Sequence, residues 1–411
     1  MKILFVSEDV PYPSMGGLAK HALTLARALV KAGHEVDFLG GNQHPIEVAG
    51  AEGQFGGRFF GELSGHLAGW KEHSLGVFLP LKRSWLARCF ARRIMRRARD
   101  YDVIHYHGHV PNVASYIPED VNFVQTRHDQ GSDCLIHTRF RDGGICTRLD
   151  PAHCAECIAS RPNRLQRVVS AAAVILYRRD VARAFRRHKT VFVSDMLRRN
   201  FARTAGPADW GAVVHNFVDL ENVRAALAAT RARSREESSG IEVFVAGKLW
   251  PPKGVGPFLR TLVPRMPDGM HVTVAGDGPD EQRLRSEYEG ERVRFLGWCA
   301  PDETLRLAAN ADRVVVPSVW EEPCATTVFE GLLLDKPTFA LARGGTPELA
   351  IYARKADQLR LHADMESLVE DLVHFRPGYT AGPEPGGPGG VEYAMQRLLE
   401  IYRAPPSAIR S

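Results

Sequence analysis

Two glutamates, Glu322 and Glu330, stand eight residues apart in the segment of residues 317–337. Apolar residues at helical spacing follow Thr327, so we predict a strand, a loop that holds Glu322, and a helix with Glu330 about one turn inside and Thr326 or Thr327 as its N-cap. Free N–H groups at a helix start attract anions, whereas carboxylates accept hydrogen bonds from sugar hydroxyls. The segment therefore suggests a ligand with both hydroxyls and phosphates, such as a nucleotide sugar. The alternative is that both acids are solvated charges that the helix dipole favours.

The N-terminal part of the chain predicts a strand, a glycine loop and a helix in succession. Residues 2–7 form a short apolar run, the following loop contains Gly16 and Gly17, and one apolar stripe then leads to a stop at Gly33. With a second strand at residues 36–39, this is a Rossmann-like βαβ unit that lacks the G-x-G-x-x-G dinucleotide fingerprint. The two loop glycines either let a ligand approach the backbone closely or simply make the loop flexible.

Two further strands are predicted at residues 102–107 and 121–126, and the second leads directly into His128. Ligands bind at the carboxyl ends of the strands in a parallel sheet. His128 is therefore well placed to reach a substrate, although a lone histidine is often structural. Strands at residues 190–194 and 212–215 complete the first predicted domain.

Four of the seven cysteines fall within 24 positions, at Cys134, Cys146, Cys154 and Cys157. Their spacing ends in C-x-x-C and fits a structural zinc site with four sulfur ligands, in an insert at about residues 130–160. Such a site leaves no open position for a substrate, so this metal would not be catalytic. Four free cysteines or an iron–sulfur cluster are the alternatives.

Two arginine-rich segments, residues 84–99 and 178–189, are predicted as helices with one apolar stripe each. Their arginines are either the solvated outer faces of core helices or a docking surface for anionic lipid head groups or a phosphorylated acceptor. Residues 45–80, before the first of these helices, are glycine-rich and predicted to be irregular.

Composition limits the classes of protein that remain. The 411 residues suffice for two domains, and 44% hydrophobic with 25% charged residues indicates a globular chain. A formal net charge of only +5, without a basic motif interleaved with aromatic residues, disfavours a nucleic-acid partner. The acids Glu8 and Asp9 are atypical of a signal peptide, and no apolar run approaches the roughly 20 residues of a membrane span. We expect a cytoplasmic protein with reduced cysteines, or one on the inner face of the plasma membrane if the basic helices dock there.

The second half predicts five steps of strand followed by helix, which make a second Rossmann-like domain. Its strands are expected at residues 241–246, 272–275, 293–296, 313–316 and 338–341. A final helix is expected at residues 391–403 after the irregular, proline- and glycine-rich residues 376–390. The predicted fold class is thus α/β, with domains at residues 1–215 and 216–390 and a C-terminal segment at residues 391–411.

Short motifs in both halves, taken together, resemble the retaining glycosyltransferases of family 4, the group 1 transferases that include proteins like glycogen synthase and phosphatidylinositol mannosyltransferase. The motifs of the second half are GKLWPPKG at 247–254, GDGP at 276–279, the glutamate pair, and GGTPE at 344–348. Those of the first half are GGLAKH at 16–21, GHEV at 33–36, DVIHYH at 102–107, His128 and HNFVD at 215–219. The resemblance implies the GT-B fold, in which two Rossmann-like domains face a cleft and the last helix crosses back to the first domain.

The resemblance also implies roles for individual residues. Glu330 would bind the ribose hydroxyls, Glu322 the donor sugar, and the lysines and backbone amides the diphosphate. The donor-binding set would be Gly16, Gly17, Lys248, Lys253, Glu322, Thr326, Thr327 and Glu330. The catalytic set would be His128, Glu322 and Lys248, without a catalytic metal or organic cofactor.

Two positions depart from the family's pattern. Lys248 stands where arginine is common, so a single ammonium group replaces a guanidinium that can donate two parallel hydrogen bonds. Ala325 stands where glycine is usual, and its Cβ could narrow the choice of donor. No convincing D-x-D metal motif is present, which is consistent with side chains holding the phosphates.

The implied activity is transfer of a sugar, with retention, from a UDP-sugar or GDP-sugar to a hydroxyl of a sugar, a lipid-linked or a small-molecule acceptor. Cell-surface polysaccharide, lipopolysaccharide or glycoconjugate synthesis is the expected setting. A nucleotide-sugar epimerase is one alternative, and it would turn over the donor without an acceptor. A nucleotide-sugar-binding scaffold is another, and it would bind the donor without releasing nucleotide diphosphate.

Overall fold

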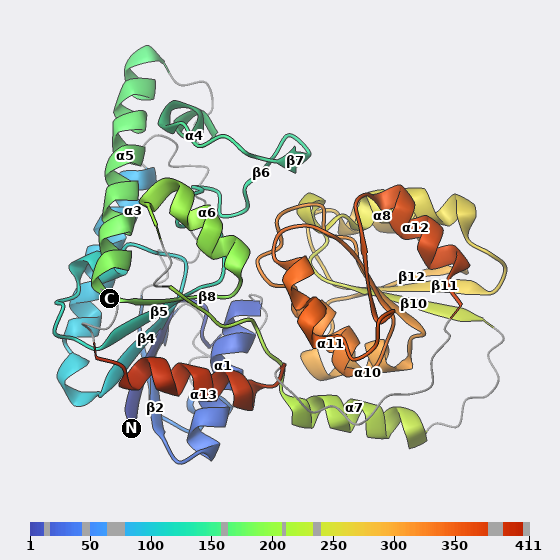
Figure 1. The fold of residues 1–411 in the computed structure, drawn as a ribbon, viewed down its shortest axis with the longest axis horizontal. Helices are drawn as coiled ribbons and strands as arrows, with labels where there is room; N and C mark the ends of the chain where they lie inside the picture. The colour runs from blue at the N-terminus through green and yellow to red at the C-terminus, as the bar shows by residue number, and fades with distance from the viewer. Residues whose placement is uncertain are drawn as a thin grey trace. The chain divides into compact units, whose positions relative to one another are not determined.

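A computed structural model describes residues 1–11, 17–42, 50–63, 79–157, 163–207, 211–232, 240–376 and 389–405. The chain divides into two units, each with its own sheet and helices (Figure 1). The first unit comprises Met1–Arg139, Cys146–His215 and Val391–Ser411, and the second comprises Phe140–Ile145 and Asn216–Gly390. Parallel sheets in two units confirm the α/β class that the sequence predicts.

The first unit is built on a seven-stranded parallel sheet in the order β3-β2-β1-β4-β5-β8-β9. Its strands are β1 (Lys2–Ser7), β2 (Glu35–Gly41), β3 (Phe59–Leu63), β4 (Val103–His107), β5 (Phe123–Arg127), β8 (Lys189–Phe192) and β9 (Ala212–Val213). The strand order reverses between β1 and β4. Ligands of open α/β sheets bind outside the carboxyl ends of the strands at such a switch point.

Six α-helices of the described residues accompany this sheet: α1 (Gly17–Lys31), α3 (Leu79–Met95), α4 (Pro151–Cys157), α5 (Arg164–Arg187), α6 (Asp195–Ala205) and α13 (Val391–Arg403). Short 3-10 helices lie at Glu52–Gln54, Ala98–Asp100 and Val113–Tyr116. The predicted final helix is confirmed as α13, which packs against α1 (Figure 1). Its buried Tyr402 hydroxyl lies 2.5 Å from Nδ1 of His105 on β4, so the end of the chain is fixed to the first sheet.

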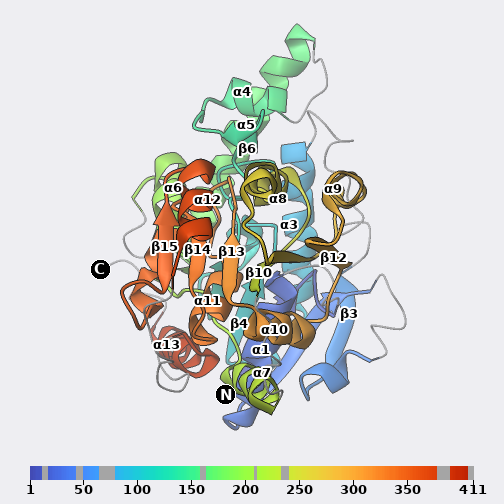
Figure 2. The same cartoon turned by 90° about the vertical axis from the view of Figure 1, so that its right-hand side faces the viewer.

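The second unit has a six-stranded parallel sheet in the order β12-β11-β10-β13-β14-β15. Its strands are β10 (Ile241–Ala246), β11 (Met270–Ala275), β12 (Val293–Gly297), β13 (Arg313–Val316), β14 (Thr338–Leu341) and β15 (Leu359–His362). Figure 2 shows β13, β14 and β15 side by side at one end of this sheet. The order reverses between β10 and β13, which makes these two strands the switch point of the second unit.

The helices of the second unit are α7 (Leu220–Ala232), α8 (Val255–Leu262), α9 (Glu281–Tyr288), α10 (Pro301–Asn310), α11 (Thr326–Leu333) and α12 (Met365–His374). Short 3-10 helices lie at Pro251–Lys253, Val263–Arg265 and Thr346–Tyr352, and the strands β6 (Phe140–Arg141) and β7 (Gly144–Ile145) pair in a small hairpin. Helices α8 and α12 cover one face of the sheet, and α10 and α11 lie on the other (Figure 1).

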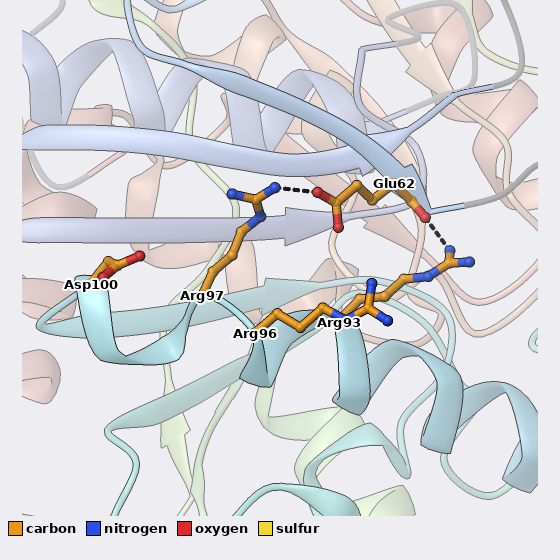
Figure 3. A pocket seen from close by; sticks show the side chains of 5 residues that line it. All are labelled: Glu62, Arg93, Arg96, Arg97 and Asp100. Carbon is orange, nitrogen blue, oxygen red and sulfur yellow. Dashed lines mark hydrogen bonds and ion pairs between the residues drawn. The ribbon is translucent and has the colours of Figure 1, made fainter.

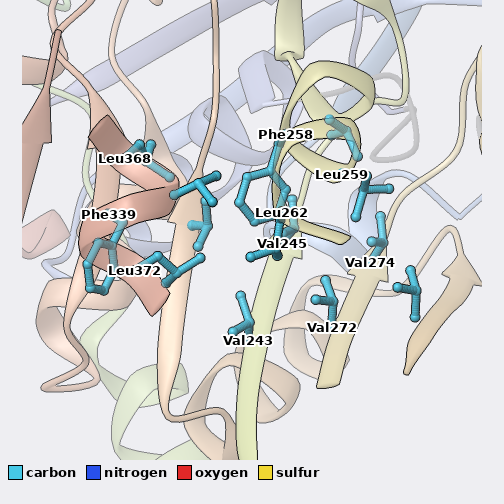
Figure 4. Close-up of a cluster of buried hydrophobic side chains, with 14 of the residues drawn as sticks. Val243, Val245, Phe258, Leu259, Leu262, Val272, Val274, Phe339, Leu368 and Leu372 are labelled. Atoms are coloured by element: carbon cyan, nitrogen blue, oxygen red, sulfur yellow. The ribbon is translucent and has the colours of Figure 1, made fainter. Parts of the chain in front are cut away.

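The core of the second unit lies between its sheet and helices α8 and α12 (Figure 4). Val243 and Val245 of β10 meet Phe258 and Leu262 of α8 and Leu372 of α12, and all five are at most 1% exposed. Burying a side chain of this size contributes about 1.5–3 kcal/mol. This packed core fixes the central strands, whose carboxyl ends carry the loops of the candidate site.

Both arginine-rich helices differ from their predicted limits. The helix predicted at residues 84–99 is α3, which begins at Leu79 because Pro80 suits a first helical turn, and ends at Met95. The helix predicted at residues 178–189 is the last part of α5, which begins at Arg164. A capping box between Asn163 and Gln166 starts α5, and its N-x-x-Q pattern is the signal that the periodicity argument missed.

Two strands of the main sheets, β3 and β15, were not predicted. β3 falls in the glycine-rich residues 45–80 that were predicted to be irregular, and residues 43–49 and 64–78 of that stretch lie outside the described residues. β15 is a sixth strand of the second sheet, where five were predicted.

Candidate functional site

In the second unit, the loops that follow β10 and β13 flank the switch point of the sheet. The loop after β10 carries Lys248 and Lys253, and the loop after β13 carries Trp320 and Glu322. The two loops touch, because the N–H of Val319 donates to the carbonyl of Pro252 at 2.9 Å. Residues distant in the sequence thus share one edge of the sheet, where ligands of this architecture bind.

Glu322 is buried and receives three polar contacts. Lys253 Nζ lies 2.8 and 2.9 Å from its two carboxylate oxygens, and Trp320 Nε1 donates to Oε2 at 2.7 Å. Hydrogen bonds to an ionised group are stronger than neutral ones, so the carboxylate holds the lysine firmly in place. Together, these contacts fix a positively charged amine beside a buried carboxylate at the switch point.

Lys248 joins the same cluster through aromatic rings. Its Nζ lies 5.4 Å from the centroid of Trp250, which meets Trp320 edge to face at 6.1 Å. Lys253 Nζ lies 5.7 Å from the centroid of Trp320. Ammonium groups are attracted to the faces of such rings. The structure therefore brings both predicted lysines and Glu322 together around two tryptophans that the sequence analysis did not assign to the site.

Two glycines allow the backbone to close around Glu322. Gly254 has φ of +70°, and a Cβ there would lie 2.0 Å from the carbonyl oxygen of Pro317. Gly344, of the GGTPE motif, has φ of +60°, and a Cβ there would lie 2.4 Å from the N–H nitrogen of Glu322. The next residue, Gly345, donates its N–H to the Glu322 carbonyl at 2.8 Å. The GKLWPPKG and GGTPE motifs thus fix the main chain that carries Glu322.

We expect Gly254→Ala to lower the free energy of unfolding by about 2–3 kcal/mol, because a left-handed alanine that also overlaps a carbonyl must displace the backbone. Thermal and denaturant unfolding measure the loss. Gly290→Ala is the matched control, since Gly290 has open space around its Cβ position and no positive φ. Equal stability of the two variants would show that the contact between Gly254 and Pro317 does not constrain the loop.

Helix α11 begins beside Glu322 and corrects one detail of the prediction. Its N-cap is Ala325, not Thr326 or Thr327, and no side chain caps the first N–H groups. The two threonines form the first turn and are half-buried, and Glu330 lies one turn further and is 5% exposed. An uncapped helix start favours an anion, since its N–H groups and dipole point positive charge outward.

The HNFVD motif reaches the same loop. The N–H of Asn216 donates to Sγ of Cys324 at 3.3 Å, and its side-chain amide donates to the Cys324 carbonyl at 3.0 Å. Burial raises the pKa of the Cys324 thiol, so this cysteine stays neutral. Asn216 therefore holds the residue before the N-cap of α11, a positioning role that the sequence analysis did not assign.

In the first unit, three histidines gather at the carboxyl ends of β4 and β5. Nδ1 of His107, at the end of β4, lies 3.1 Å from Nε2 of His128, which follows β5. The ring of His21 on α1 lies 4.6 Å from that of His128. Burial and the neighbouring His21 and Arg127 hold the pKa of His128 well below its usual value, so its imidazole is neutral near pH 7. Of the two predicted loop glycines, Gly17 begins α1 and Gly16 lies outside the described residues.

An ion-pair network adjoins these histidines. His109 donates to Asp129 at 2.8 Å and to Asp9 at 3.0 Å, and Asp129 also accepts from Arg127 at 3.2 Å and lies 3.2 Å from Nδ1 of His137. Burial would raise the pKa of Asp129, but His137, His109 and Arg127 bring it well below its usual value. Burial would lower the pKa of His109, but Asp9 and Asp129 raise it well above its usual value. Asp129, the residue after His128, is thus ionised and is held in place by His109, His137 and Arg127.

The four clustered cysteines do not meet as a single set. Two groups of three metal-binding side chains have ligand atoms within 4.8 Å of one another in the described ranges, and neither contains a cysteine. Burial raises the pKa of the Cys134 thiol to about 12, with smaller contributions from Asp133 and Cys157. Cys154 Sγ instead accepts from Arg178 at 3.2 Å, and Cys146 Sγ lies 3.8 Å from Nε2 of His153. The four-sulfur zinc site therefore stays a prediction from spacing alone.

A cavity of about 510 Å³ lies elsewhere in the first unit, between β3 and the end of α3 (Figure 3). Arg97 pairs with the carboxylate of Glu62, and Arg93 donates to the Glu62 carbonyl. Arg96 and Asp100 complete its lining. Three arginines against two acids leave little net charge, and the cavity lies at the sheet edge, away from the switch point.

Comparison with known proteins identifies the class. The chain belongs to glycosyltransferase family 4, whose model, "Glycosyltransferase Family 4", matches residues 15–222, and the model "Glycosyl transferases group 1" matches residues 240–375. It is 24% identical over 399 residues to a glycogen synthase of Mycobacterium tuberculosis, covering 90% of this chain and 86% of that protein. The chain is thus a transferase, and the predicted family is confirmed.

Solved structures extend the comparison to the fold. HepE of Anabaena, in complex with UDP and glucose, matches with a TM-score of 0.60 at 17% identity over 97% of this chain and 98% of that one. The catalytic domain of starch synthase IV from Arabidopsis thaliana, bound to ADP and acarbose, matches with a TM-score of 0.56 at 14% identity over 100% and 99%. The chain accordingly has the GT-B fold, as the sequence predicts.

Proposed function

We propose that this glycosyltransferase moves a sugar from a nucleotide-diphosphate donor, UDP-sugar in the first instance, to an acceptor hydroxyl with retention at the anomeric carbon. The observation that carries the proposal is the cluster of Lys253, Glu322 and Trp320 beside the uncapped start of α11. This cluster combines a fixed cation, a buried carboxylate that can accept hydrogen bonds from sugar hydroxyls, and a helix start that favours anions. A site for a nucleotide sugar requires these three features.

In this proposal the second unit binds the donor. A leaving diphosphate gains negative charge as the glycosidic bond breaks, and a cation already in place stabilises that charge. Lys253 and Lys248 supply the cations, and the N–H groups around Thr326 and Thr327 supply neutral donors. Glu330, one turn into α11, binds the ribose hydroxyls. Glu322 holds Lys253 and retains a lone pair for a hydroxyl of the donor sugar.

Related proteins support the choice of donor. HepE is described in complex with UDP and with UDP-glucose, and starch synthase IV with ADP. All of these ligands carry a diphosphate on a ribose. The HepE complexes favour UDP-sugar as the first choice, and GDP-sugar is the second.

The first unit supplies His128 in this proposal. A neutral imidazole next to the transferring sugar can exchange hydrogen bonds with sugar hydroxyls without repelling the partial positive charge of the reacting carbon. The acceptor attacks from the face that the diphosphate leaves, and a phosphate oxygen takes the acceptor proton. Retention follows from attack on that face.

A donor panel tests the proposal. A nucleotide sugar that binds the folded chain at 100 times its dissociation constant stabilises it by about 2.7 kcal/mol, which a thermal-unfolding screen of UDP-, GDP- and ADP-sugars detects. Proton NMR of enzyme with the stabilising donor and an acceptor then gives the anomeric configuration of the product. Conversion of the donor without acceptor would instead favour the epimerase, and binding without release of nucleotide diphosphate the scaffold.

For the acceptor, we propose a lipid-linked or otherwise membrane-held molecule at an anionic bilayer, as in cell-surface glycoconjugate synthesis. Helix α5 exposes Leu165, Val168, Val169 and Leu176 by 73%, 64%, 44% and 55%. Exposed arginines continue the same helical face toward its C-terminus, and α3 repeats the pattern with Leu81 and Trp85 followed by Arg88 and Arg92. Apolar residues that lie beside arginines on one helix face suit the interface of an anionic membrane.

Flotation with liposomes tests this surface. We expect the protein to float with vesicles that contain 30% anionic lipid (roughly one added kcal/mol of attraction per arginine near the surface) and not with neutral vesicles. Leu165→Glu with Leu176→Glu should abolish flotation, whereas Ile351→Glu, at a residue 70% exposed in the second unit, should leave it intact. Equal flotation of all variants would refute the surface. Within the described residues, no helix combines the length and the apolar content that crossing a bilayer requires.

A further inference from the structure

The two lysines of the cluster in the second unit are held in different ways. Lys253 Nζ lies 2.8 and 2.9 Å from the carboxylate oxygens of Glu322, so a negative charge opposes it directly. Lys248 makes no ion pair within the described part of the chain, and its contact is with the ring of Trp250, whose centroid lies 5.4 Å from Nζ. An aromatic face attracts an ammonium group without cancelling its charge. Lys248 therefore keeps a positive charge that Lys253 shares with its partner.

The ring of Trp250 is itself fixed by packing. It meets the ring of Trp320 edge to face at 6.1 Å, and Trp320 is 7% exposed and donates its Nε1–H to Glu322 at 2.7 Å. Trp250 is half-buried, and its own Nε1 is buried and has no hydrogen-bond partner among the described residues. The indole is thus held against a neighbour that is anchored to Glu322, and its ring face is the part that contacts a charged group.

The main chain beneath Lys248 and Trp250 is also fixed. The N–H of Leu249 donates to the carbonyl of Asp277 at 2.6 Å, and the N–H of Trp250 donates to the carbonyl of Lys248 at 3.0 Å. The long stem of the exposed Lys248 is therefore the mobile part of this loop. A lysine stem loses rotamer freedom when its ammonium binds a ligand, and a ring that already restricts the ammonium lowers that loss.

We propose that Trp250 is a positioning residue for Lys248, which holds the ammonium beside its ring and leaves the charge available to the diphosphate of the donor. This role rests on the proposed function, in which Lys248 contacts the diphosphate. Phosphate oxygens form strong charge-assisted hydrogen bonds with an ammonium that no carboxylate opposes. Trp250 would raise the affinity for the diphosphate through Lys248 and not by touching the ligand.

A double-mutant cycle between Trp250 and Lys248 tests this role. Calorimetry with the full chain at low ionic strength would measure binding of UDP, with GDP and ADP in parallel. Lys248→Met should weaken binding at least about 10-fold, and Trp250→Leu about 3–10-fold. In the Lys248→Met background, Trp250→Leu should cause no further loss, because the ring has no ammonium left to hold. Trp250→Phe keeps an aromatic face and removes only the N–H, so it should stay within about twofold of the wild type.

Phe375→Leu is the matched control, since it removes a ring centred 5.0 Å from the guanidinium carbon of Arg360 in the same unit and should leave the affinity unchanged. Thermal unfolding checks the fold of each variant, and Trp250→Met, which also lacks an aromatic face, carries the cycle if Trp250→Leu does not fold.

The outcomes separate this role from the donor site itself. If Trp250→Leu weakens binding equally with and without Lys248, or if Trp250→Phe loses as much affinity as Trp250→Leu, the positioning role is overturned and the donor site stands. If the wild type binds none of the three nucleoside diphosphates, or if Lys248→Met binds as the wild type does, the assignment of Lys248 to the diphosphate is refuted and the role of Trp250 with it.

Discussion

Lys253→Met should lower the rate constant of sugar transfer by about 10²–10³-fold, because one preorganised donor to a leaving group typically contributes that much. Lys253 Nζ is fixed by both oxygens of Glu322, so the cation is in place before the donor arrives. Methionine keeps most of the length of the side chain and removes the charge. Steady-state assays that separate kcat from KM measure the effect, and we expect most of it in kcat.

A second lysine–carboxylate pair in the same unit provides the control. Lys355 Nζ lies 3.0 Å from Asp335, with the two side chains 20% and 17% exposed, close to the 26% of Lys253. Lys355→Met therefore removes a comparable ion pair outside the cluster and should leave kcat unchanged. Equal loss of kcat in both variants would mean that the Lys253 effect arises from stability, which would remove this lysine from the proposed mechanism.

Glu330→Ala should weaken binding of the nucleotide diphosphate at least about 100-fold, since hydrogen bonds to a charged group contribute about 1.5–3 kcal/mol each and a ribose offers two hydroxyls. Glu330 is buried one turn into α11, where an ordered carboxylate loses little freedom on binding. Calorimetry with UDP and with the corresponding 2′,3′-dideoxynucleotide separates the ribose contacts from those to the phosphates. The dideoxynucleotide should bind wild type and variant equally.

Two further variants make that measurement specific. Glu330→Gln keeps the shape and one acceptor oxygen, so an intermediate affinity is expected. Glu370→Ala, at an exposed position on α12, should bind UDP as the wild type does. If Glu330→Ala binds UDP with unchanged affinity while its unfolding transition stays normal, the ribose assignment is wrong and the second unit holds the nucleotide in another way.

The local order of elements could be predicted where apolar periodicity is strong. β10, β13 and α13 match their predicted limits, because the apolar pattern of a central strand or an amphipathic helix shows which of its residues are buried. α5 was only partly predicted, since its exposed apolar residues obscure the helical stripe. β3 and β15 were missed, because β3 lies in a glycine-rich stretch and β15 is only four residues long with apolar and basic residues in alternation.

In the candidate site, too, single residues could be predicted from local motifs, but contacts between residues distant in the sequence could not. The sequence identified Lys253 and Glu322 separately through their motifs. It did not show that the two residues, 69 positions apart, form an ion pair to which Trp320 adds a hydrogen bond. That contact depends on Gly254, whose missing Cβ lets two loops meet. Asn216 was overlooked for the same reason, because its partner Cys324 lies 108 positions away.

By itself the sequence determined the family, the α/β class and the identities of the acids and lysines, because motif spacing and burial patterns are properties of short segments. Only the tertiary structure decided that three histidines from α1, β4 and β5 share one place, and that Lys253 meets Glu322 across 69 positions. The physical reason is that parallel strands bring their carboxyl ends to one edge of a sheet, whatever their separation in the chain.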